Sequence, residues 1–403
     1  MKKLLIGLAI VMVALIAFWQ MGGIDFLLAR TIFSPDYSEE VVEEQQNEEV
    51  IEDINNDEEE DVILEELEYS SDELEYTLEI IGEDFEIPWE ILPLSDDEIL
   101  ITERAGRVIL LNSGVIHTQT NVEHTGEAGL LGLEKSIDFE ESKKIYLYYT
   151  YRDGNNLYNR VSKFIYDGKS LKNEEYVLDK IPGSRFHNGG RIKFGPDGKL
   201  YITTGDAQVP DLSQDLDSLA GKILRINPDG SIPDDNPIEN SMVYALGLRN
   251  PQGLSWHPIT GDLYASDHGP NSQDEINKIL PGENYGWPRV TCTSSDDRFK
   301  DPISCYSSYT LAPSGITFLP WENTIDNPLY VAGLRGNMVL KIDIDTQGDL
   351  IKQEPIINDY GRIRTIIYFR GSFYIATNNR DGRGTPSDND DLIIKVTPNL
   401  PTQ

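Results

Sequence analysis

One histidine of the chain stands in a setting that suits acid–base chemistry. His187 lies in the run RFHNGGR at 185–191, directly before a predicted strand at 192–194, and Asp206 ends the next predicted strand. Adjacent strand ends can bring an imidazole and a carboxylate together, and a carboxylate on one ring nitrogen leaves the other nitrogen as a base. A histidine with a purely structural role fits the same spacing, so the spacing alone leaves both interpretations open.

Two turn-rich runs are candidates for a metal site. The first is GLRNPQG at 247–253, and the second is DHGPNSQDEIN at 267–277, followed by NYGWP at 284–288. Carbonyl and carboxylate oxygens in turns rich in Gly and Pro suit a hard cation such as Ca²⁺. The spacing is not that of an EF-hand loop, and hydrogen-bonded turns without metal explain the same composition.

Arginines form a third constellation. Arg362 and Arg364 lie two apart in GRIR at 361–364, and alternate residues of a strand face the same side. Two guanidinium groups on one face suit a polycarboxylate or a phosphate. Arg335, in GLRG at 333–336, ends a predicted strand of the preceding repeat and can join them. In so acidic a chain, these arginines indicate an anion site rather than solubility charges.

A repeated strand-and-turn unit must position these residues. Turns rich in Asp, Gly or Pro alternate with short strands of aliphatic and aromatic residues at intervals of about 45–65 residues. The six repeated strands are at 99–101, 145–149, 200–202, 263–265, 329–331 and 373–375. Six four-stranded units account for the chain from about residue 80 onward, so we predict an all-β, six-bladed β-propeller. A pair of β-sandwiches is the alternative, but it does not explain the repeat length.

Length and charge narrow the function classes. The 403 residues carry 34 Lys and Arg against 69 Asp and Glu, a formal net charge of −35. Such acidity argues against nucleic-acid binding, which needs a basic surface. Between Asp36 and Glu75 the chain has 20 acidic residues and no Lys or Arg. We expect an extended linker there, with a cation-binding or partner-binding tail as the alternative.

The N-terminus predicts a membrane anchor. Two lysines precede the uninterrupted apolar run Leu4–Trp19, and the apolar character continues far enough to span a bilayer. The lack of a small-residue cleavage pattern favours an uncleaved anchor over a signal peptide. The lysines place the N-terminus in the cytoplasm. The expected division is an anchor at 1–30, an acidic disordered linker at 31–76 and the propeller at 77–403.

This topology predicts an extracytoplasmic domain. It would be anchored to the cytoplasmic membrane, or secreted if the N-terminal segment is cleaved. The chain has two cysteines, too few for a disulfide scaffold or a Cys-rich metal site. In an oxidising compartment Cys292 and Cys305 could pair across a short loop, and two free thiols are the alternative.

Several motifs together resemble the soluble quinoprotein glucose and aldose sugar dehydrogenases, also called the sorbosone dehydrogenase family. They are the His187 and Gly205-Asp206 pairing, the runs at 247–253 and 269–287, PW at 88–89, ITERAGR at 101–107 and GEAGLLG at 126–132. The likeness covers about residues 80–397. It implies a six-bladed propeller that binds pyrroloquinoline quinone (PQQ) and Ca²⁺ and oxidises the C1 hydroxyl of aldoses to lactones.

The resemblance also implies roles for residues of this chain. His187 would remove the substrate hydroxyl proton, with Asp206 orienting it. Arg249 and Asn250 would contact the quinone, and Arg249 would take part in catalysis by polarising the reactive carbonyl region. The remaining implied cofactor contacts are Glu127, His187, Arg335, Arg362 and Arg364, the three arginines pairing with the carboxylates of PQQ.

Two calcium sites follow from the same resemblance. The backbone oxygens of Gly269 and Pro270 would hold a Ca²⁺ that bridges to PQQ and acts as a Lewis acid. Glu275 and the carbonyl of Tyr285 would form a second, structural Ca²⁺ site.

Three positions depart from the family pattern. Glu127 stands where many members have Gln, and a carboxylate beside an anionic cofactor weakens binding unless it is protonated or paired. Phe186 replaces the acidic residue that precedes the histidine in the glucose enzyme, which suits the broader aldose branch. Thr365 follows the arginine pair where Asp is frequent.

The leading hypothesis is an anchored PQQ- and Ca²⁺-dependent sugar dehydrogenase. Its partners would be a sugar substrate, an extracytoplasmic electron acceptor and, through the N-terminal helix, a membrane. One alternative is a non-enzymatic, Ca²⁺-stabilised binding module like the hedgehog-interacting proteins, which has no need of His187 together with the arginines. Another is a Ca²⁺-dependent propeller lactonase, which leaves Arg362 and Arg364 unexplained.

Overall fold

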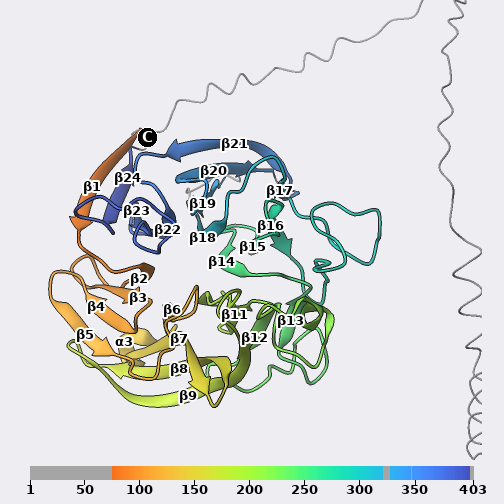
Figure 1. The fold of residues 1–403 in the computed structure, drawn as a ribbon, viewed down its shortest axis with the longest axis horizontal. Helices are drawn as coiled ribbons and strands as arrows, with labels where there is room; N and C mark the ends of the chain where they lie inside the picture. Colours follow the sequence, from red (N-terminus) through yellow and green to blue (C-terminus); the bar gives the residue numbers. More distant parts are fainter. Residues whose placement is uncertain (1–74, 321–326, 346, 400–403) are drawn as a thin grey trace, which may run out of the picture. The chain divides into compact units, whose positions relative to one another are not determined.

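A computed structural model describes residues 75–320, 327–345 and 347–399. Within them, six antiparallel sheets of four strands each surround a central axis (Figure 1). The predicted six-bladed β-propeller is therefore confirmed. The predicted anchor at 1–30 and the predicted linker as far as residue 74 lie outside the described residues. No helix in the described part of the chain has the length and apolar character needed to cross a membrane.

The first three blades follow chain order from the axis outward. The first blade contains β2 (Pro88–Pro93), β3 (Ile99–Glu103), β4 (Arg107–Leu110) and β5 (Gly114–Thr118). The second contains β6 (Leu130–Lys135), β7 (Lys144–Asp153), β8 (Asn156–Tyr166) and β9 (Leu171–Gly183). The third contains β10 (Ile192–Phe194), β11 (Leu200–Thr204), β12 (Lys222–Ile226) and β13 (Val243–Leu246).

The last three blades complete the ring. The fourth contains β14 (Pro251–Trp256), β15 (Leu263–Asp267), β16 (Asp274–Ile279) and β17 (Ser304–Tyr306). The fifth contains β18 (Pro313–Phe318), β19 (Leu329–Gly333), β20 (Met338–Ile344) and β21 (Leu350–Ile357). The sixth contains β22 (Ile363–Phe369), β23 (Ser372–Thr377), β24 (Ile393–Pro398) and β1 (Tyr76–Gly82), which pairs with β24 and closes the ring.

The repeated strands read from the sequence all occupy one position in their blades. They lie in β3, β7, β11, β15, β19 and β23, each the second strand from the axis. These strands are buried on both faces because neighbouring blades pack against each side, as in β3 and β19, where every residue is buried. A strand covered on both faces carries a nearly continuous apolar run, which is why the signal was strong.

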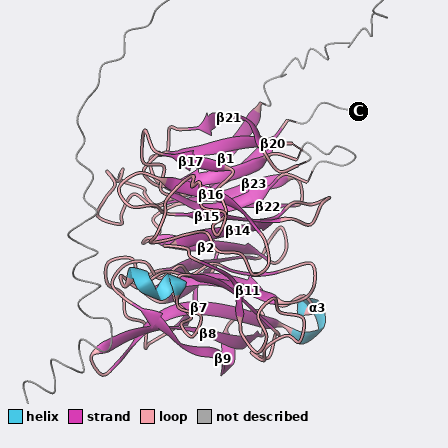
Figure 2. Cartoon of the chain, turned by 90° about the vertical axis from the view of Figure 1, so that its right-hand side faces the viewer, coloured by secondary structure: helices cyan, strands magenta, loops and turns pink. Residues whose placement is uncertain are grey.

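Short helices are minor parts of the described chain. They are α3 (Phe139–Ser142) and the 3₁₀ segment η1 (Pro210–Gln214), and Figure 2 shows that strands and loops make up the rest. Cys292 and Cys305 form a disulfide, so pairing is confirmed over free thiols. The bond joins the loop after β16 to β17.

A polar network ties the blades together at the axis. Arg191, before β10, is buried and forms an ion pair with the buried Glu90 of β2. Its Nε donates to the carbonyl of Gln252 in β14 at 2.8 Å. Thr365 of β22 lies 3.3 Å from both Glu90 and Arg191. This threonine, a departure from the family pattern, thus contributes to a structural network between blades.

Candidate active site

The predicted site residues lie at one rim of the propeller, most of them on loops, with Glu275 in β16 and Arg364 in β22. In each antiparallel blade, the start of the innermost strand and the end of the second strand meet at the same face. His187 and Asn250 precede innermost strands β10 and β14, while Asp206 and His268 follow second strands β11 and β15. The fold therefore gathers segments that are far apart in the sequence.

The structure brings His187 and Asp206 into contact. His187 Nδ1 lies 2.8 Å from Asp206 Oδ1, and the Asp206 side chain is buried. Trp287 Nε1 donates to Asp206 Oδ2 at 2.9 Å, so both carboxylate oxygens are engaged. The His187 side chain is 19% exposed. With Nδ1 held by the carboxylate, Nε2 is the nitrogen left to accept a proton.

Glycine at position 205 permits this contact. A Cβ on Gly205 would collide with the carbonyl oxygen of His187, because the loop before β10 crosses the end of β11 closely. His187 itself has φ of 59°, an unusual conformation for a residue with a side chain. Position 205 thus needs glycine because there is no room for a side chain, and Asp206 supplies the carboxylate.

Asn250 joins three loops of the site. Its side-chain oxygen accepts the amide of Gly189 at 3.0 Å, and its Nδ2 lies 3.4 Å from Glu127 Oε2. The buried carboxylate of Asp267 accepts the backbone amides of Arg249 and Asn250 at 2.8 and 2.6 Å. Asp267, which the sequence suggested only as part of a turn, fixes the backbone of the predicted quinone contacts.

A group of buried guanidiniums faces the same region. Within the described residues, Nε of each is buried without a hydrogen-bond partner in Arg104, Arg249, Arg362 and Arg364. Arg364 Nη1 donates to the amide oxygen of Gln252 at 2.7 Å rather than to a carboxylate. Burial lowers the pKa of Arg364 to about 9, and the nearby Arg104 adds to this effect. Such unmatched donors suit the oxygens of a bound anion.

The arginines are not equivalent in their surroundings. Arg362 is paired with Asp381 at 2.9 Å, and its Nη1 donates to the carbonyl of Leu334 at 3.2 Å. The loop that contains Arg335 therefore lies beside Arg362, as expected, but the Arg335 side chain is exposed. Arg104, which was not predicted to take part, is instead buried beside Arg362 and Arg364.

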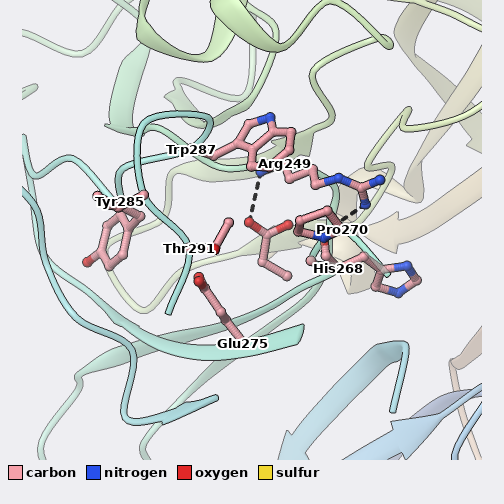
Figure 3. A pocket seen from close by; sticks show the side chains of 10 residues that line it. Arg249, His268, Pro270, Glu275, Tyr285, Trp287 and Thr291 are labelled. Carbon is pink, nitrogen blue, oxygen red and sulfur yellow. Dashed lines mark hydrogen bonds between the residues drawn. The ribbon is translucent and has the colours of Figure 1, made fainter. Parts of the chain in front are cut away.

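The four predicted calcium-site residues line one small cavity. Gly269, Pro270, Glu275 and Tyr285 surround a space of about 10 Å³, the room of roughly one water or ion (Figure 3). The Tyr285 hydroxyl donates to the carbonyl of Lys278 at 2.7 Å, which turns the phenol away from the cavity. Asp267 also lines the cavity.

The two carboxylates at this cavity have raised pKa values. Burial, together with the charge of Asp267, raises the pKa of Glu275 to about 8. Burial likewise raises the pKa of Asp267 to about 6. In the described ranges no cluster of three or more His, Cys, Asp or Glu side chains forms a metal site. Two carboxylate residues, Asp267 and Glu275, are among the residues that line the cavity, and carboxylate oxygens are ligands that Ca²⁺ accepts.

The remaining departures from the family pattern also meet at this rim. Glu127 Oε1 forms an ion pair with Arg383 Nη1 at 2.8 Å, so this carboxylate is paired. The ring of Phe186 lies 5.3 Å from the guanidinium of Arg185 and 5.5 Å from that of Arg383. Sequence reasoning did not identify Arg383, although the unusual Glu127 was itself a signal that a basic partner was needed.

Comparison with known proteins places this geometry in context. A model of the family described as glucose/sorbosone dehydrogenase matches residues 85–393. Quinoprotein glucose dehydrogenase B of Acinetobacter calcoaceticus is 36% identical over 263 residues, 56% of this chain and 54% of that protein, so the match spans about half of the relative. Human hedgehog-interacting protein is 30% identical over 202 residues, 41% of this chain and 29% of that protein.

Solved structures extend the comparison to the whole propeller. A crystal structure of a protein from Thermus thermophilus superposes with a TM-score of 0.75 at 39% identity, covering 80% of this chain and 100% of the other. The PQQ-bound form of an aldose sugar dehydrogenase from Streptomyces coelicolor superposes with a TM-score of 0.73 at 33% identity, covering 80% and 98%.

Proposed function

The chain belongs to the glucose/sorbosone dehydrogenase family, and from this premise we propose that it oxidises aldose sugars at C1 to lactones with PQQ and Ca²⁺. One observation carries the proposal: the His187–Asp206 pair shares a rim with buried guanidiniums whose Nε atoms have no acceptor in the described chain. A proton acceptor beside an anion site is what an oxidation with an anionic quinone requires.

The residues present fit a tricarboxylate such as PQQ. Buried Nε donors without acceptors are costly, and bound carboxylates would supply the missing partners. Arg104, Arg362 and Arg364 would hold the carboxylates, with Arg335 reaching in from its exposed loop. Arg249, whose guanidinium lies 5.4 Å from the Trp287 ring, would lie beside the quinone together with Asn250.

The protein's own part in the chemistry is to move one proton. Asp206 holds Nδ1 of His187, so Nε2 accepts the proton of the sugar C1 hydroxyl as the C1 hydride leaves. Trp287 and the amide of Gln208 hold Asp206, which keeps the imidazole in one tautomer. PQQ, when bound, supplies the two-electron acceptor.

Calcium would occupy the cavity lined by Gly269, Pro270 and Glu275. Its charge would offset the buried carboxylates of Glu275 and Asp267 and polarise a neighbouring oxygen of the cofactor. Asp274 prepares this turn, because its carboxylate accepts the amide of Gly269 at 3.0 Å. The stoichiometry of calcium binding tests this arrangement: one Ca²⁺ per chain would mean a single site in this cavity, and two would support the two predicted sites.

We also propose an extracytoplasmic, membrane-anchored location and an electron acceptor in the same compartment. The lysines before Leu4–Trp19 support this topology, and the Cys292–Cys305 disulfide suits an oxidising compartment. Labelling of the full chain in intact cells with a membrane-impermeant reagent tests it, since a cytoplasmic propeller would be protected.

Binding and turnover test the main proposal. The purified full chain is titrated with PQQ in the presence of CaCl₂ by calorimetry, and reduction of an artificial dye is followed with a panel of aldoses. We expect saturable PQQ binding and sugar-dependent dye reduction. An absence of PQQ binding contradicts the proposal, whatever the sugar.

A non-enzymatic, Ca²⁺-stabilised binding module is the second candidate, favoured by the partial likeness to hedgehog-interacting protein. It predicts calcium binding without PQQ binding. A Ca²⁺-dependent lactonase predicts lactone hydrolysis without dye reduction, and it leaves the buried Arg362 and Arg364 without a purpose.

A further inference from the structure

Glu127 places a negative charge among the loops assigned to an anionic cofactor. Its Oε2 lies 3.4 Å from both the backbone amide of His187 and Nδ2 of Asn250. The Glu127 side chain is 15% exposed, so water screens its charge poorly. Left alone, this carboxylate would repel a cofactor that occupied the rim.

Arg383 reaches this carboxylate from the opposite end of the chain. It lies in the loop after β23, and its Nη1 donates to Glu127 Oε1 at 2.8 Å. The same guanidinium lies 5.5 Å from the ring of Phe186, which is next to His187. One side chain of the sixth blade therefore contacts the loop before β6 and the loop before β10.

The Arg383 loop is itself firmly held. Asp381 Oδ1 accepts the Arg383 amide at 2.9 Å, while Asp381 Oδ2 pairs with Arg362 at 2.9 Å. Gly384 packs so closely that a Cβ there would press on the backbone of Asn379. The loop thus supplies a negative group to Arg362 and a positive group to Glu127.

We propose that Arg383 is a positioning residue of this site, whose guanidinium offsets the charge of Glu127 and allows an anion to bind beside it. The ion pair also keeps Glu127 oriented toward His187 and Asn250. The identity of the anion rests on the proposed function, but the charge compensation does not.

The first test measures PQQ affinity by calorimetry at neutral pH. We expect Arg383→Gln to weaken PQQ binding by about 10- to 100-fold, because a like charge is left beside the ligand. The double variant Glu127→Gln/Arg383→Gln should return to within about threefold of the wild type. Arg185→Gln is the matched control, because Arg185 contacts the same Phe186 ring, and it should change affinity by less than about twofold.

Rescue in the double variant is the decisive readout. If the double variant binds PQQ as weakly as Arg383→Gln, then Arg383 acts as a direct ligand or a loop support, and the charge-compensation proposal is overturned. A merely structural role for Arg383 also predicts that Arg383→Lys fails like Arg383→Gln. Charge compensation instead predicts that lysine retains most of the affinity.

A second test needs no cofactor, so it remains decisive if the wild type fails to bind PQQ and the proposed function falls. In the apo protein at pH 7, Arg383→Gln should lower the thermal midpoint by about 2–4 °C. Adding Glu127→Gln should restore most of that loss, since it removes the uncompensated charge. A double variant no more stable than Arg383→Gln would overturn the proposal.

Discussion

Two buried arginines of the propeller, Arg191 and Arg364, differ in their partners. Arg191 at the axis has the carboxylate of Glu90, the carbonyl of Gln252 and the hydroxyl of Thr365. Arg364 at the rim has the amide oxygen of Gln252 and no ion-paired carboxylate in the described chain. Each guanidinium keeps one buried nitrogen without an acceptor there, Nη2 in Arg191 and Nε in Arg364. The first arrangement has a carboxylate partner and holds blades together. The second lacks one, which is how a site prepared for an anion differs from a structural ion pair.

The largest effect should follow from breaking the axial pair. Glu90→Met leaves Arg191 buried and unpaired, and we expect a loss of about 3–5 kcal/mol in the free energy of unfolding. Denaturant unfolding measures it, and Glu90→Met/Arg191→Met should recover much of the stability. A loss below about 1 kcal/mol in the single variant would remove the axial half of the comparison.

The base at the rim should matter to rate and not to stability. His187→Gln removes the proton acceptor, and we expect kcat to fall by about 10²- to 10⁴-fold. PQQ affinity and the thermal midpoint should change little, because His187 is partly exposed. Loss of PQQ binding in place of turnover would mean that His187 holds the cofactor instead of moving a proton.

Removal of calcium should destabilise the fourth blade. Calcium at about 100 times its dissociation constant should add about 2.7 kcal/mol to the free energy of unfolding, and a chelator should remove this gain. Glu275→Gln should abolish most of it. Magnesium is the control, since it prefers a smaller octahedral site. Equal stabilisation by both ions would argue against a dedicated calcium cavity.

The rim arginine should behave opposite to the axial one. Arg364→Met removes a buried charge that has no ion-paired carboxylate in the described chain, so the stability of the apo protein should stay the same or rise. The PQQ affinity should fall by about tenfold or more. Calorimetry with thermal unfolding measures both quantities. An apo destabilisation as large as that of Glu90→Met would erase the contrast between the two arginines.

The smallest effect concerns pH. Against burial, which raises it, His268 and Arg383 hold the pKa of Glu127 at about 2, below its ordinary value of 4.5. A lowered pKa contributes stability above the ordinary value, and the contribution disappears as the pH falls toward the folded value. The wild type should therefore lose about 1 kcal/mol relative to Glu127→Gln between pH 5 and pH 2. A constant difference would mean that Glu127 is not stabilised as a carboxylate.

The blades could be predicted from the sequence because their signal is local. Strands such as β11 and β19 are buried on both sides, and each shows its apolar run and its preceding turn within a few residues. The His187 and Asp206 contact was accessible for a similar reason, since both lie at ends of adjacent strands. Local patterns of this kind can be recognised in a sequence without knowledge of the rest of the fold.

The partners within the rim could not be predicted in this way. Arg383 and Glu127 are 256 residues apart and meet because the ring closes, so no local pattern links them. Arg335 and Arg364 look alike in the sequence, but Arg335 is exposed in the loop after β19, whereas Arg364 is buried in β22. A role for Arg104 could not be predicted because a single arginine after a strand has no distinctive spacing.

The closure of the sixth blade has a consequence for synthesis of the chain. Tyr76 of β1 pairs with Pro398 of β24, near the two ends of the described chain. A ribosome makes β1 first among the propeller strands and β24 last. The edge of β1 that pairs with β24 therefore stays unpaired until translation is almost finished. Nascent chains stalled before residue 393 should therefore leave the backbone edge of β1 that pairs with β24 open to proteases and chaperones, and release of the last strand should close that edge.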